Sequence, residues 1–516
     1  MSGSSHPTVP ENTQDPREIE LKLEFDPADL GRLHAHPLLG GTNGTQKTLR
    51  STYYDTSDLV LRKAGVSLRV READGRFVQT IKSPNGHAGL FNRSEWKQEL
   101  KGRDIDLIAA RDTALEPLLS VRVRNALQPV FETRVERTVY QIERNGSEIE
   151  VALDRGEVDA GGRQTAIHEL ELELMRGEAT ELFSVARELD AIVPLRIAAK
   201  AKADRGYELI EDAKQTFQKA SPVELDASMA SSHAFRAIVR NCLRQIIDNE
   251  PGVCAGDAEA LHQMRIGLRR LRTAIASFAP VSAGSEQDRI KAELKWATKA
   301  LGPARDLDVF ATDVLKHLSE TGANEKEFAE ASRDFTLRRA EAYARTADMV
   351  RSDRFRRTLL DVAEWVEVGP WITGAAAHAD TKQPVAEHAA EVLAKLRKRI
   401  RKKGRRVHEL NARARHKLRI RTKNLRYSIE FFAGLFPGHK DAKRREAALS
   451  SLKALQDTLG SLNDMVTRKA LVSNGDSLNS HAAAMVEAGE AKADKLLDQA
   501  RAAHADFNQV KAFWKS

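Results

Sequence analysis

The chain has few cysteines, few aromatic residues and no long apolar runs. Among its 516 residues are 2 cysteines, and aromatic residues make up 5%. A disulfide-stapled secreted domain needs more cysteines, so we expect a reducing compartment and a structural role for Cys242 and Cys254. No apolar run approaches the roughly 18 residues that span a bilayer, and the first 16 residues have no apolar stretch of the kind in a signal peptide. We therefore expect a cytoplasmic protein without a membrane partner, in which residues 1–16 form a flexible leader.

Charge is abundant, and its two signs are unevenly distributed along the chain. Residues 1–210 contain 29 Lys and Arg against 34 Asp and Glu, a net charge of −5. The remaining residues contain 53 Lys and Arg against 40 Asp and Glu, a net charge of +13. The length predicts two or three domains. The asymmetry predicts that the second half faces a polyanion.

Two hydrophobic patterns divide the chain. Up to about residue 202, short segments of alternating polar and apolar residues are separated by Gly, Asn and Asp turns, which is typical of an antiparallel sheet or barrel. Beyond about residue 221, apolar residues recur three and four positions apart, which predicts helices. The sequence therefore predicts a multidomain α+β protein with domains at 17–210 and 228–512, joined by a linker at 211–227.

The predicted strands of the first half have one charged face. Segments 18–25, 67–71 and 168–174 each alternate charged with apolar residues. A charged face on a single strand is most often simply solvated, but three glutamates at alternate positions repel each other unless a counter-charge is near. Carboxylate clusters suit hard cations such as Mg²⁺ or Mn²⁺, and arginines that face the same space can clamp phosphate oxygens. Together these strands indicate a polyphosphate site.

A series of short motifs over about 17–210 resembles the CYTH family of triphosphate tunnel metalloenzymes. It opens with ExExK at Glu18, Glu20 and Lys22, and the later motifs are YYDT, SLRVR, QTIK, NRSEW, ERTVY, ALDRGEV, HELELEL and AKADRGY. The resemblance implies an eight-stranded antiparallel β tunnel with flanking helices. It also implies that the tunnel binds Mg²⁺ or Mn²⁺ and cleaves a triphosphate.

The resemblance further implies roles for individual residues. The implied metal ligands are Glu18, Glu20 and Asp154 with two of Glu169, Glu171 and Glu173. The implied triphosphate-binding residues are Lys22, Arg69, Arg71, Lys82, Arg93, Arg137 and Lys202. The catalytic candidates are Lys22, Lys82 and Tyr54, with Tyr53 as the alternative tyrosine. For Lys82, phosphate binding is favoured over a role as base, because a base would need a strongly lowered pKa, which nearby carboxylates oppose.

The helical half contains an internal repeat. Residues 261–278 align without gaps with residues 415–432, and the similar segments LGPARDLDVF and LGSLNDMVTR follow the two copies. Self-similarity of this kind is the signature of a duplicated helical unit. We therefore predict two antiparallel helical bundles, at about 228–368 and 384–512.

Basic residues recur in register in the two copies. On a helix they form one stripe opposite the apolar face, made of His262, Arg265, Arg269 and Arg272 in the first copy and His416, Arg419, Lys423 and Arg426 in the second. Residues 391–427 hold 16 Lys and Arg against two Glu. Single-strand recognition stacks bases on aromatic residues, and only Tyr427 lies nearby. A phosphate-only ligand is therefore favoured over nucleic acid, with duplex binding through counterion release as the open alternative.

These helices and the LGxxRDxD segment resemble the CHAD family over about 228–512. The resemblance implies that the repeat-related basic residues bind inorganic polyphosphate. The second copy departs from the pattern, with Asn463 in place of Arg305 and no counterpart of Asp308, which weakens a symmetric role for that pair. An alternative interpretation makes the histidines structural, hydrogen-bonded to Asp306 and Asp464.

The leading hypothesis is an enzyme of the CYTH–CHAD type, an inorganic triphosphatase whose helical domain binds polyphosphate. Thiamine triphosphate and nucleoside triphosphates are alternative substrates, because tunnels of this family also act on them. A hypothesis of another class is a non-enzymatic polyphosphate-binding or granule-associated protein whose tunnel is only a sensor. The complete carboxylate set argues against a tunnel that has lost activity.

Overall fold

The computed structural model describes residues 17–40, 44–83, 92–211, 216–320, 325–373, 382–472 and 493–514. The predicted leader, residues 1–16, lies outside the described residues. The chain divides into two compact units, residues 1–214 and 215–516, and this boundary falls within the predicted linker.

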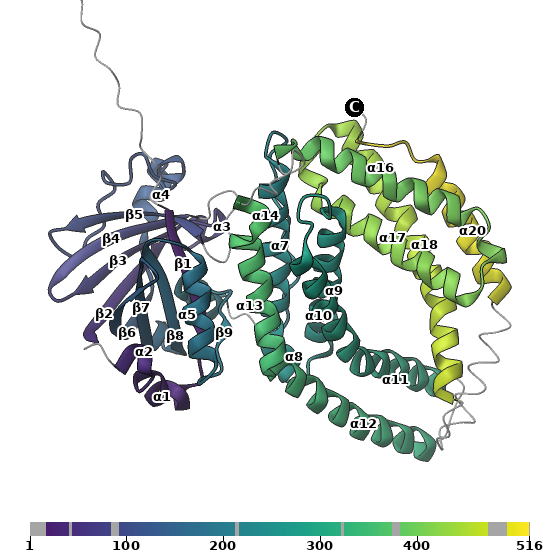
Figure 1. Ribbon diagram of the computed structural model, residues 1–516, viewed down its shortest axis with the longest axis horizontal. Coiled ribbons are helices and arrows are strands. Elements are labelled where there is room, and N and C mark those ends of the chain that lie inside the picture. Colours follow the sequence, from purple (N-terminus) through teal and green to yellow (C-terminus); the bar gives the residue numbers. More distant parts are fainter. Residues whose placement is uncertain are drawn as a thin grey trace, which may run out of the picture. The chain divides into compact units, whose positions relative to one another are not determined.

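The first unit is built on one antiparallel sheet. Its strands are β1 (Arg17–Glu24), β2 (Thr45–Asp55), β3 (Ser67–Ala73), β4 (Arg76–Ser83), β5 (Asn92–Leu100), β6 (Gln128–Arg144), β7 (Ser147–Ala160), β8 (Arg163–Arg176) and β9 (Arg196–Ile197). Their order is β5-β4-β3-β2-β6-β7-β8-β1-β9, and a further pairing of β5 with β1 closes strands β1 to β8 into a tunnel (Figure 1). The predicted eight-stranded antiparallel tunnel is confirmed, with β9 added beside β1.

Short helices flank this tunnel. They are α1 (Leu30–His34), α2 (Pro37–Gly40), α3 (Val60–Lys63), α4 (Val121–Ala126), α5 (Thr180–Asp190) and α6 (Lys202–Ile210). Helix α5 packs on β8, while α6 contacts β6, β7 and β8. Helix α6 therefore returns the end of the first unit to the sheet.

The strand register decides which side chains share the inner face of the tunnel. Glu169 of β8 lies opposite Asp154 of β7, which in turn lies opposite Arg137 of β6. Lys22 of β1 lies opposite Glu171 of β8. Directly opposed residues of neighbouring strands project to the same face of a sheet. The charged residues that alternate along these strands are therefore collected on one face.

One end of the inner face is apolar and is covered by α6. The Tyr207 ring meets the Phe131 ring edge-on at 5.2 Å, and both belong to a buried cluster that includes Tyr53. The Tyr207 hydroxyl donates to Asp55 Oδ2 at 3.0 Å. This packing fixes the position of α6, whose first residue is Lys202.

Replacing Gly206 by alanine is expected to disturb this packing. A Cβ at Gly206 would lie 2.3 Å from the Phe131 ring, so the ring or α6 must move. Overpacking of this kind costs about 1–3 kcal/mol, and thermal unfolding should show a lower Tm. The control is Gly102→Ala, because a Cβ there meets nothing within 4 Å. Equal Tm values for the two variants would contradict the packing of α6 on Phe131.

The regular elements described in the second unit are all helical, as predicted. They are α7 (Ser231–Ile247), α8 (Glu250–Cys254), α9 (Ala258–Ser277), α10 (Ser285–Ala300), α11 (Gly302–Glu320), α12 (Glu325–Arg351), α13 (Asp353–Val368), α14 (Pro370–Thr373), α16 (Val385–Gly404), α17 (Ala412–Phe431), α18 (His439–Val472) and α20 (Ala493–Gln509). Helices α9 and α17 carry the two copies of the repeat (Figure 1).

Helices α9 and α17 pack against each other through equivalent positions. The rings of Phe278 and Phe432, which the repeat aligns, lie 5.9 Å apart. Ser277 Oγ lies 3.3 Å from Ser428 Oγ beside them. The two copies therefore meet at the repeat-related rings of Phe278 and Phe432, and their polar stripes lie in one neighbourhood.

The copies differ after this helix. In the first copy α10 ends at Ala300 and α11 begins at Gly302, whereas in the second copy α18 runs without a break through the corresponding Gly460. Proline lacks a backbone N–H and fits only the first turn of a helix. Pro303 follows Gly302 in the first copy, while Ser461 occupies this place in the second. The proline explains the break.

Candidate active site

Three carboxylates from β7 and β8 gather on the inner face of the tunnel, and we call them the carboxylate cluster: Asp154, Glu169 and Glu171. One oxygen from each lies within 4.8 Å of one from the others. Asp154 and Glu169 are fully buried. Donor sets of carboxylate oxygen alone suit hard divalent cations such as Mg²⁺ and Mn²⁺. The cluster therefore fits the metal that the sequence predicts, without distinguishing between the two.

Lys202 and Arg137 neutralise this cluster. Lys202 Nζ lies 2.8 Å from Asp154, 2.6 Å from Glu169 and 2.8 Å from Glu171. Arg137 donates two hydrogen bonds of 2.7 Å to Asp154 and a further one to Glu171. Burial alone would lower the pKa of Lys202, but the three carboxylates outweigh burial and raise it. Burial alone would raise the pKa of Glu171, but Lys202, Lys22 and Arg137 hold it well below its usual range.

Lys22 connects the cluster to β1. Its Nζ lies 2.9 Å from Glu171 Oε1 and 3.4 Å from Glu20 Oε1. Burial would lower the pKa of Lys22, but Glu171 and Glu20 raise it above its usual range. Lys22 is therefore a cation at neutral pH, which suits phosphate binding better than proton abstraction.

Glu173, the third glutamate of β8, lies in a different acidic row. It is opposite Glu20 of β1 and Glu150 of β7. Burial raises the pKa of Glu173, and Glu20 and Glu150 raise it further, against the opposing effect of Lys97. The structure thus brings Glu169 and Glu171 to Asp154 and leaves Glu173 beside Glu20.

Glu18 and Arg93 are placed only by their backbones. Glu18 of β1 lies opposite Arg93 of β5, at the pairing that closes the tunnel. Their side chains lie outside the described part of the structure. Their predicted roles in metal and triphosphate binding stay predictions.

Arginines of β3 form a basic part of the inner face. Burial and the neighbouring cations Arg69 and Arg137 lower the pKa of Arg71 to about 10. Arg71 Nε donates to Ser51 Oγ at 3.2 Å. Arg69 Nε is buried and has no hydrogen-bond partner among the described residues. A phosphate chain would supply negative charge beside Arg71 and an acceptor for Arg69 Nε.

Glu95 of β5 is the acidic residue of this basic region. It lies 3.6 Å from Arg69 and 3.4 Å from Lys82 Nζ. The structure therefore places Lys82 and Arg69 at the same carboxylate. This position fits phosphate binding by Lys82.

The structure separates the two tyrosine candidates. Tyr53 is hydrogen-bonded to Arg69; burial alone would raise the pKa of Tyr53, but Arg69 and Arg71 lower it. Tyr54 packs in another apolar cluster, and its hydroxyl donates to the carbonyl of Arg103 at 3.3 Å. The structure does not bring Tyr54 to the carboxylate cluster or the arginines, so Tyr53 becomes our candidate.

Sequence reasoning missed two charged side chains near the site. Lys47 of β2 lies opposite Arg137 and so shares its face of the sheet. Arg205 of α6 bonds Glu24 and lies 3.3 Å from Glu169. The alternation of polar and apolar residues along β2 could have placed Lys47 on the inner face. However, Leu49, two residues later on the same face, is apolar and interrupts the row of charged residues. Arg205 depends on the return of α6 to the sheet, which no local pattern shows.

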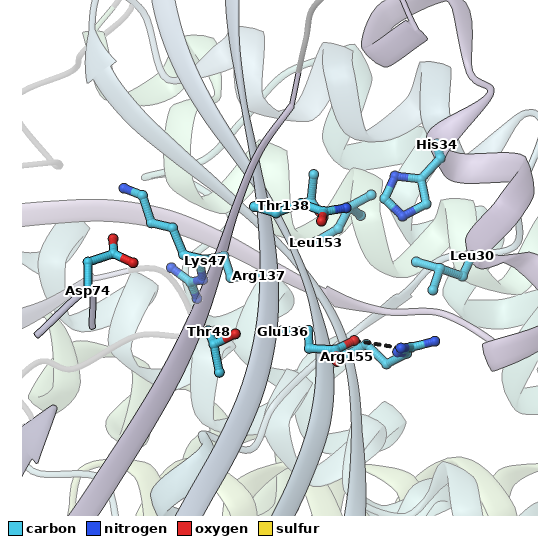
Figure 2. Close-up of a pocket in the computed structure, with 11 residues that line it drawn as sticks. Leu30, His34, Lys47, Thr48, Asp74, Glu136, Arg137, Thr138, Leu153 and Arg155 are labelled. Carbon is cyan, nitrogen blue, oxygen red and sulfur yellow. Dashed lines mark hydrogen bonds and ion pairs between the residues drawn. The ribbon is translucent and has the colours of Figure 1, made fainter. Parts of the chain in front are cut away.

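A cavity of about 630 Å³ adjoins the site on the side of β2, β6 and β7. Figure 2 shows His34 from α1, Lys47 from β2 and Arg155 from β7 around it, with Arg155 paired to Glu136. Arg137 also lines the cavity. Several of the lining side chains, among them Glu136, Thr138 and Arg155, alternate with Arg137 and Asp154 along their strands and so point to the outer face of the sheet. The cavity therefore lies on the outer side of the tunnel wall, behind the carboxylate cluster.

In the helical unit, the polar stripes of α9 and α17 form one group, which we call the basic cluster: Arg269, Arg419, Lys423 and Arg426. Burial and the charges of Arg269, Arg419 and Arg426 lower the pKa of Lys423 to about 6. Arg419 Nε is buried without a hydrogen-bond partner among the described residues. Arg269 belongs to the first copy and the other three to the second, so the cluster is shared between the repeats.

The LG segments leave room for an arginine from each stripe. Arg265 donates to the carbonyl of Leu301 at 2.6 Å, beside Gly302. In the second copy, a Cβ on Gly460 would lie 3.3 Å from Arg419. The glycines of the repeated segments thus lie under equivalent arginines. Arg272 lies further along α9, where burial and Arg269 lower its pKa.

The two histidines of the stripes have different surroundings. His416 Nδ1 lies 2.8 Å from Asn463 Oδ1, so its partner is the residue before Asp464. Burial and the charge of Arg305 lower the pKa of His262. Asn463 occupies the place of Arg305 in the second copy. The first histidine therefore has a cation beside it, whereas the second is hydrogen-bonded to an amide.

Comparison with known proteins adds the following similarities. Residues 16–207 match the family model of the CYTH domain, and residues 237–473 match that of the CHAD domain. The inorganic triphosphatase of Haemophilus influenzae is 34% identical over 195 residues, which cover 37% of this chain and 54% of that protein. The match thus spans about half the length of this curated relative. Among the described residues, every helix is too short or too polar to cross a bilayer.

Solved structures resemble each half separately. The CHAD domain of the plant Ricinus communis is 30% identical with a TM-score of 0.44, covering 57% of this chain and 98% of that one. A protein from Hippeastrum described as having a dominant triphosphatase activity is 16% identical with a TM-score of 0.29, covering 38% of this chain and 96% of that one.

Proposed function

Because the chain joins a CYTH domain to a CHAD domain, we propose that it hydrolyses inorganic triphosphate in its tunnel and binds inorganic polyphosphate through its helical unit. One observation carries the first part: the carboxylate cluster and the arginines of β3 share the inner face of one closed sheet. A site for a divalent cation beside a site for a polyanion is what phosphoanhydride cleavage needs.

The residues of the tunnel would divide this work between them. Asp154, Glu169 and Glu171 would hold the cation, which neutralises charge on the phosphate oxygens when bound. Arg69 and Arg71 would bind the phosphates, since Arg71 is crowded by Arg69 and Arg137 and Arg69 Nε lacks an acceptor among the described residues.

Tyr53 is our candidate for orienting the attacking water. Its pKa is lowered by Arg69 and Arg71, so its hydroxyl loses its proton more readily than an ordinary phenol, and the phenolate oxygen would accept a hydrogen bond from the water. Water attacks the terminal phosphorus, the bond to the diphosphate oxygen breaks, and the proton of the water leaves with phosphate or solvent. The products are phosphate and diphosphate.

The inner face favours inorganic triphosphate over substrates with a base. Its aromatic residues Tyr53, Phe131 and Tyr207 pack on one another in a buried cluster, which leaves them no free face for stacking. The Haemophilus influenzae relative, an inorganic triphosphatase, supports the same substrate. Thiamine triphosphate and nucleoside triphosphates remain the alternatives to be measured.

Phosphate release by the full chain tests this proposal. We expect inorganic triphosphate to be cleaved at least about tenfold faster, in kcat/KM, than ATP or thiamine triphosphate, a difference of roughly 1.4 kcal/mol. Activity should require Mg²⁺ or Mn²⁺ and disappear with a chelator. If none of the three is cleaved above background, the tunnel is a sensor, the enzyme hypothesis is wrong, and only polyphosphate binding remains.

Polyphosphate binding by the helical unit is supported by the basic cluster. Its four cations come from both repeats and crowd one another enough to lower the pKa of Lys423 to about 6. A linear chain of phosphates would relieve that repulsion at several positions at once. A cytoplasmic location, and an association with polyphosphate granules, are further parts of this proposal.

A further inference from the structure

Lys202 occupies the place among the carboxylates that a metal would take. Its ammonium has three N–H donors, and one oxygen each of Asp154, Glu169 and Glu171 lies 2.6–2.8 Å from Nζ. Lys202 donates hydrogen bonds to Glu169 and Glu171, and it forms an ion pair with Asp154. The same three side chains form the oxygen set that fits a divalent cation.

We propose that Lys202 is an internal competitor for the metal site, which a divalent cation must displace, and that the freed ammonium then turns to the triphosphate. This inference rests on the proposed function, because it assigns the metal to the carboxylate cluster. Mg²⁺ binds oxygen at 2.0–2.1 Å, so an ion in contact with these oxygens leaves no room for an ammonium among them. Two cations at one position also repel each other strongly in a buried site.

The neighbouring arginines are less able to yield. Arg137 is held to Asp154 by two hydrogen bonds and by a third contact to Glu171. Arg205 is shared between Glu24 and Glu169. Lys202, by contrast, has a flexible four-carbon side chain that ends in a compact charge.

The backbone of Lys202 stays fixed while its side chain moves. Ala201 N–H donates to Asp204 at 2.9 Å, which caps α6, and Tyr207 anchors the helix in the apolar cluster. The charge of Lys202 also contributes to lowering the pKa of Tyr53. The ammonium is thus already within electrostatic range of the region assigned to phosphate, and rotation of the side chain can exchange carboxylates for phosphate oxygens.

The charge balance makes the exchange useful. Lys22, Arg137, Lys202 and Arg205 already contact the three carboxylates. A divalent cation added to this set creates excess positive charge, which a triphosphate removes. We therefore expect Mn²⁺ and triphosphate to bind with positive coupling in the natural protein, and with weaker coupling once Lys202 has no charge.

Mn²⁺ binding measured without triphosphate tests the inference independently of turnover. With electron paramagnetic resonance or calorimetry on the full chain, Lys202→Met is expected to bind Mn²⁺ about tenfold more tightly than the natural protein, since one buried competing charge is gone. The same variant should bind triphosphate more weakly. The matched control is Lys200→Met, because Lys200 is paired with Glu208 at 2.8 Å, outside the cluster.

A labelling experiment on the natural protein covers the case in which Lys202→Met does not fold. An amine-reactive ester followed by peptide mass spectrometry should modify Lys202 several-fold more after Mg²⁺ is added, while modification of Lys200 stays constant. Mn²⁺ binding that is unchanged or weaker in a folded Lys202→Met, or labelling that Mg²⁺ does not increase, would overturn the inference. If tighter Mn²⁺ binding and increased labelling are found but no triphosphate is cleaved, the inference stands and the proposed activity alone is wrong.

Discussion

Replacing Glu171 by glutamine is expected to lower triphosphate hydrolysis by about 10²- to 10³-fold, the usual effect of removing one preorganised charged group from an active site. Glu171 joins three cations of the tunnel, since Lys22, Arg137 and Lys202 all contact it. Glutamine keeps the shape but has no negative charge to share with a cation. The measurement is kcat for phosphate release by the full chain at saturating metal, with Mn²⁺ affinity measured beside it.

The control for this variant is Glu148→Gln. Glu148 lies at the start of β7 in an exposed ion pair with Arg176, 2.7 Å long. Exposed pairs contribute little to stability, so turnover should stay at the natural level. Removing Glu171 leaves three cations without their shared partner, and a thermal melt must therefore show that the variant is folded. A folded Glu171→Gln variant with turnover within threefold of the natural protein would contradict the assigned role of the carboxylate cluster.

The alternation of β8 was enough to predict a face of glutamates, but not which of them act together. Period-two alternation places Glu169, Glu171 and Glu173 on one face whatever strand lies beside them. The choice among them depends on register, because Asp154 of β7 lies opposite Glu169, while Glu150 lies opposite Glu173. The register depends on pairing between strands that are distant in the chain, and it cannot be predicted from the alternation within one strand.

The position of Lys202 illustrates a second limit of sequence reasoning. The sequence motif predicted that Lys202 binds phosphate. In the structure its Nζ instead lies among the three carboxylates of the cluster. That contact requires α6 to return to the sheet through Tyr207 and Phe131. These residues have no shared local pattern, so the apparent conflict between phosphate binder and carboxylate partner becomes visible only in three dimensions.

In the helical unit, the gapless alignment predicted equivalent helices, which are α9 and α17. It did not predict that their stripes converge, because convergence depends on the packing of Phe278 against Phe432. The break between α10 and α11 was within reach of the sequence, since Pro303 has no counterpart in the second copy. Local breakers are therefore readable, whereas helix–helix packing is not.

Replacing Arg269 and Arg419 together by glutamine is expected to weaken polyphosphate binding by about 10- to 100-fold, as the loss of two charge-assisted contacts predicts. The two arginines come from different repeats and lie near enough that Arg269 contributes to lowering the pKa of Arg419. A polyphosphate chain that crosses from one repeat to the other at this point would meet both. The measurement is a titration of the full chain with long-chain polyphosphate at several salt concentrations, and the salt slope should fall by about one to two in the double variant.

The matched control removes the same charge elsewhere on the helical unit. Lys295 and Lys299 of α10 are exposed, and their double replacement by glutamine should change the affinity by no more than about twofold, since an exposed charge outside the basic cluster acts on the polymer only through a screened field. Triphosphate hydrolysis should be equal in both double variants, because the basic cluster is no part of the tunnel. Equal losses of affinity in the two variants would mean that net charge, and not the basic cluster, binds the polymer. A parallel titration with duplex DNA at equal phosphate concentration decides between the two polyanions. Both carry phosphate charge, but only polyphosphate is a single flexible chain that can enter a cluster shared by two helices, so we expect tighter binding of polyphosphate. Preference for DNA would refute polyphosphate as the ligand.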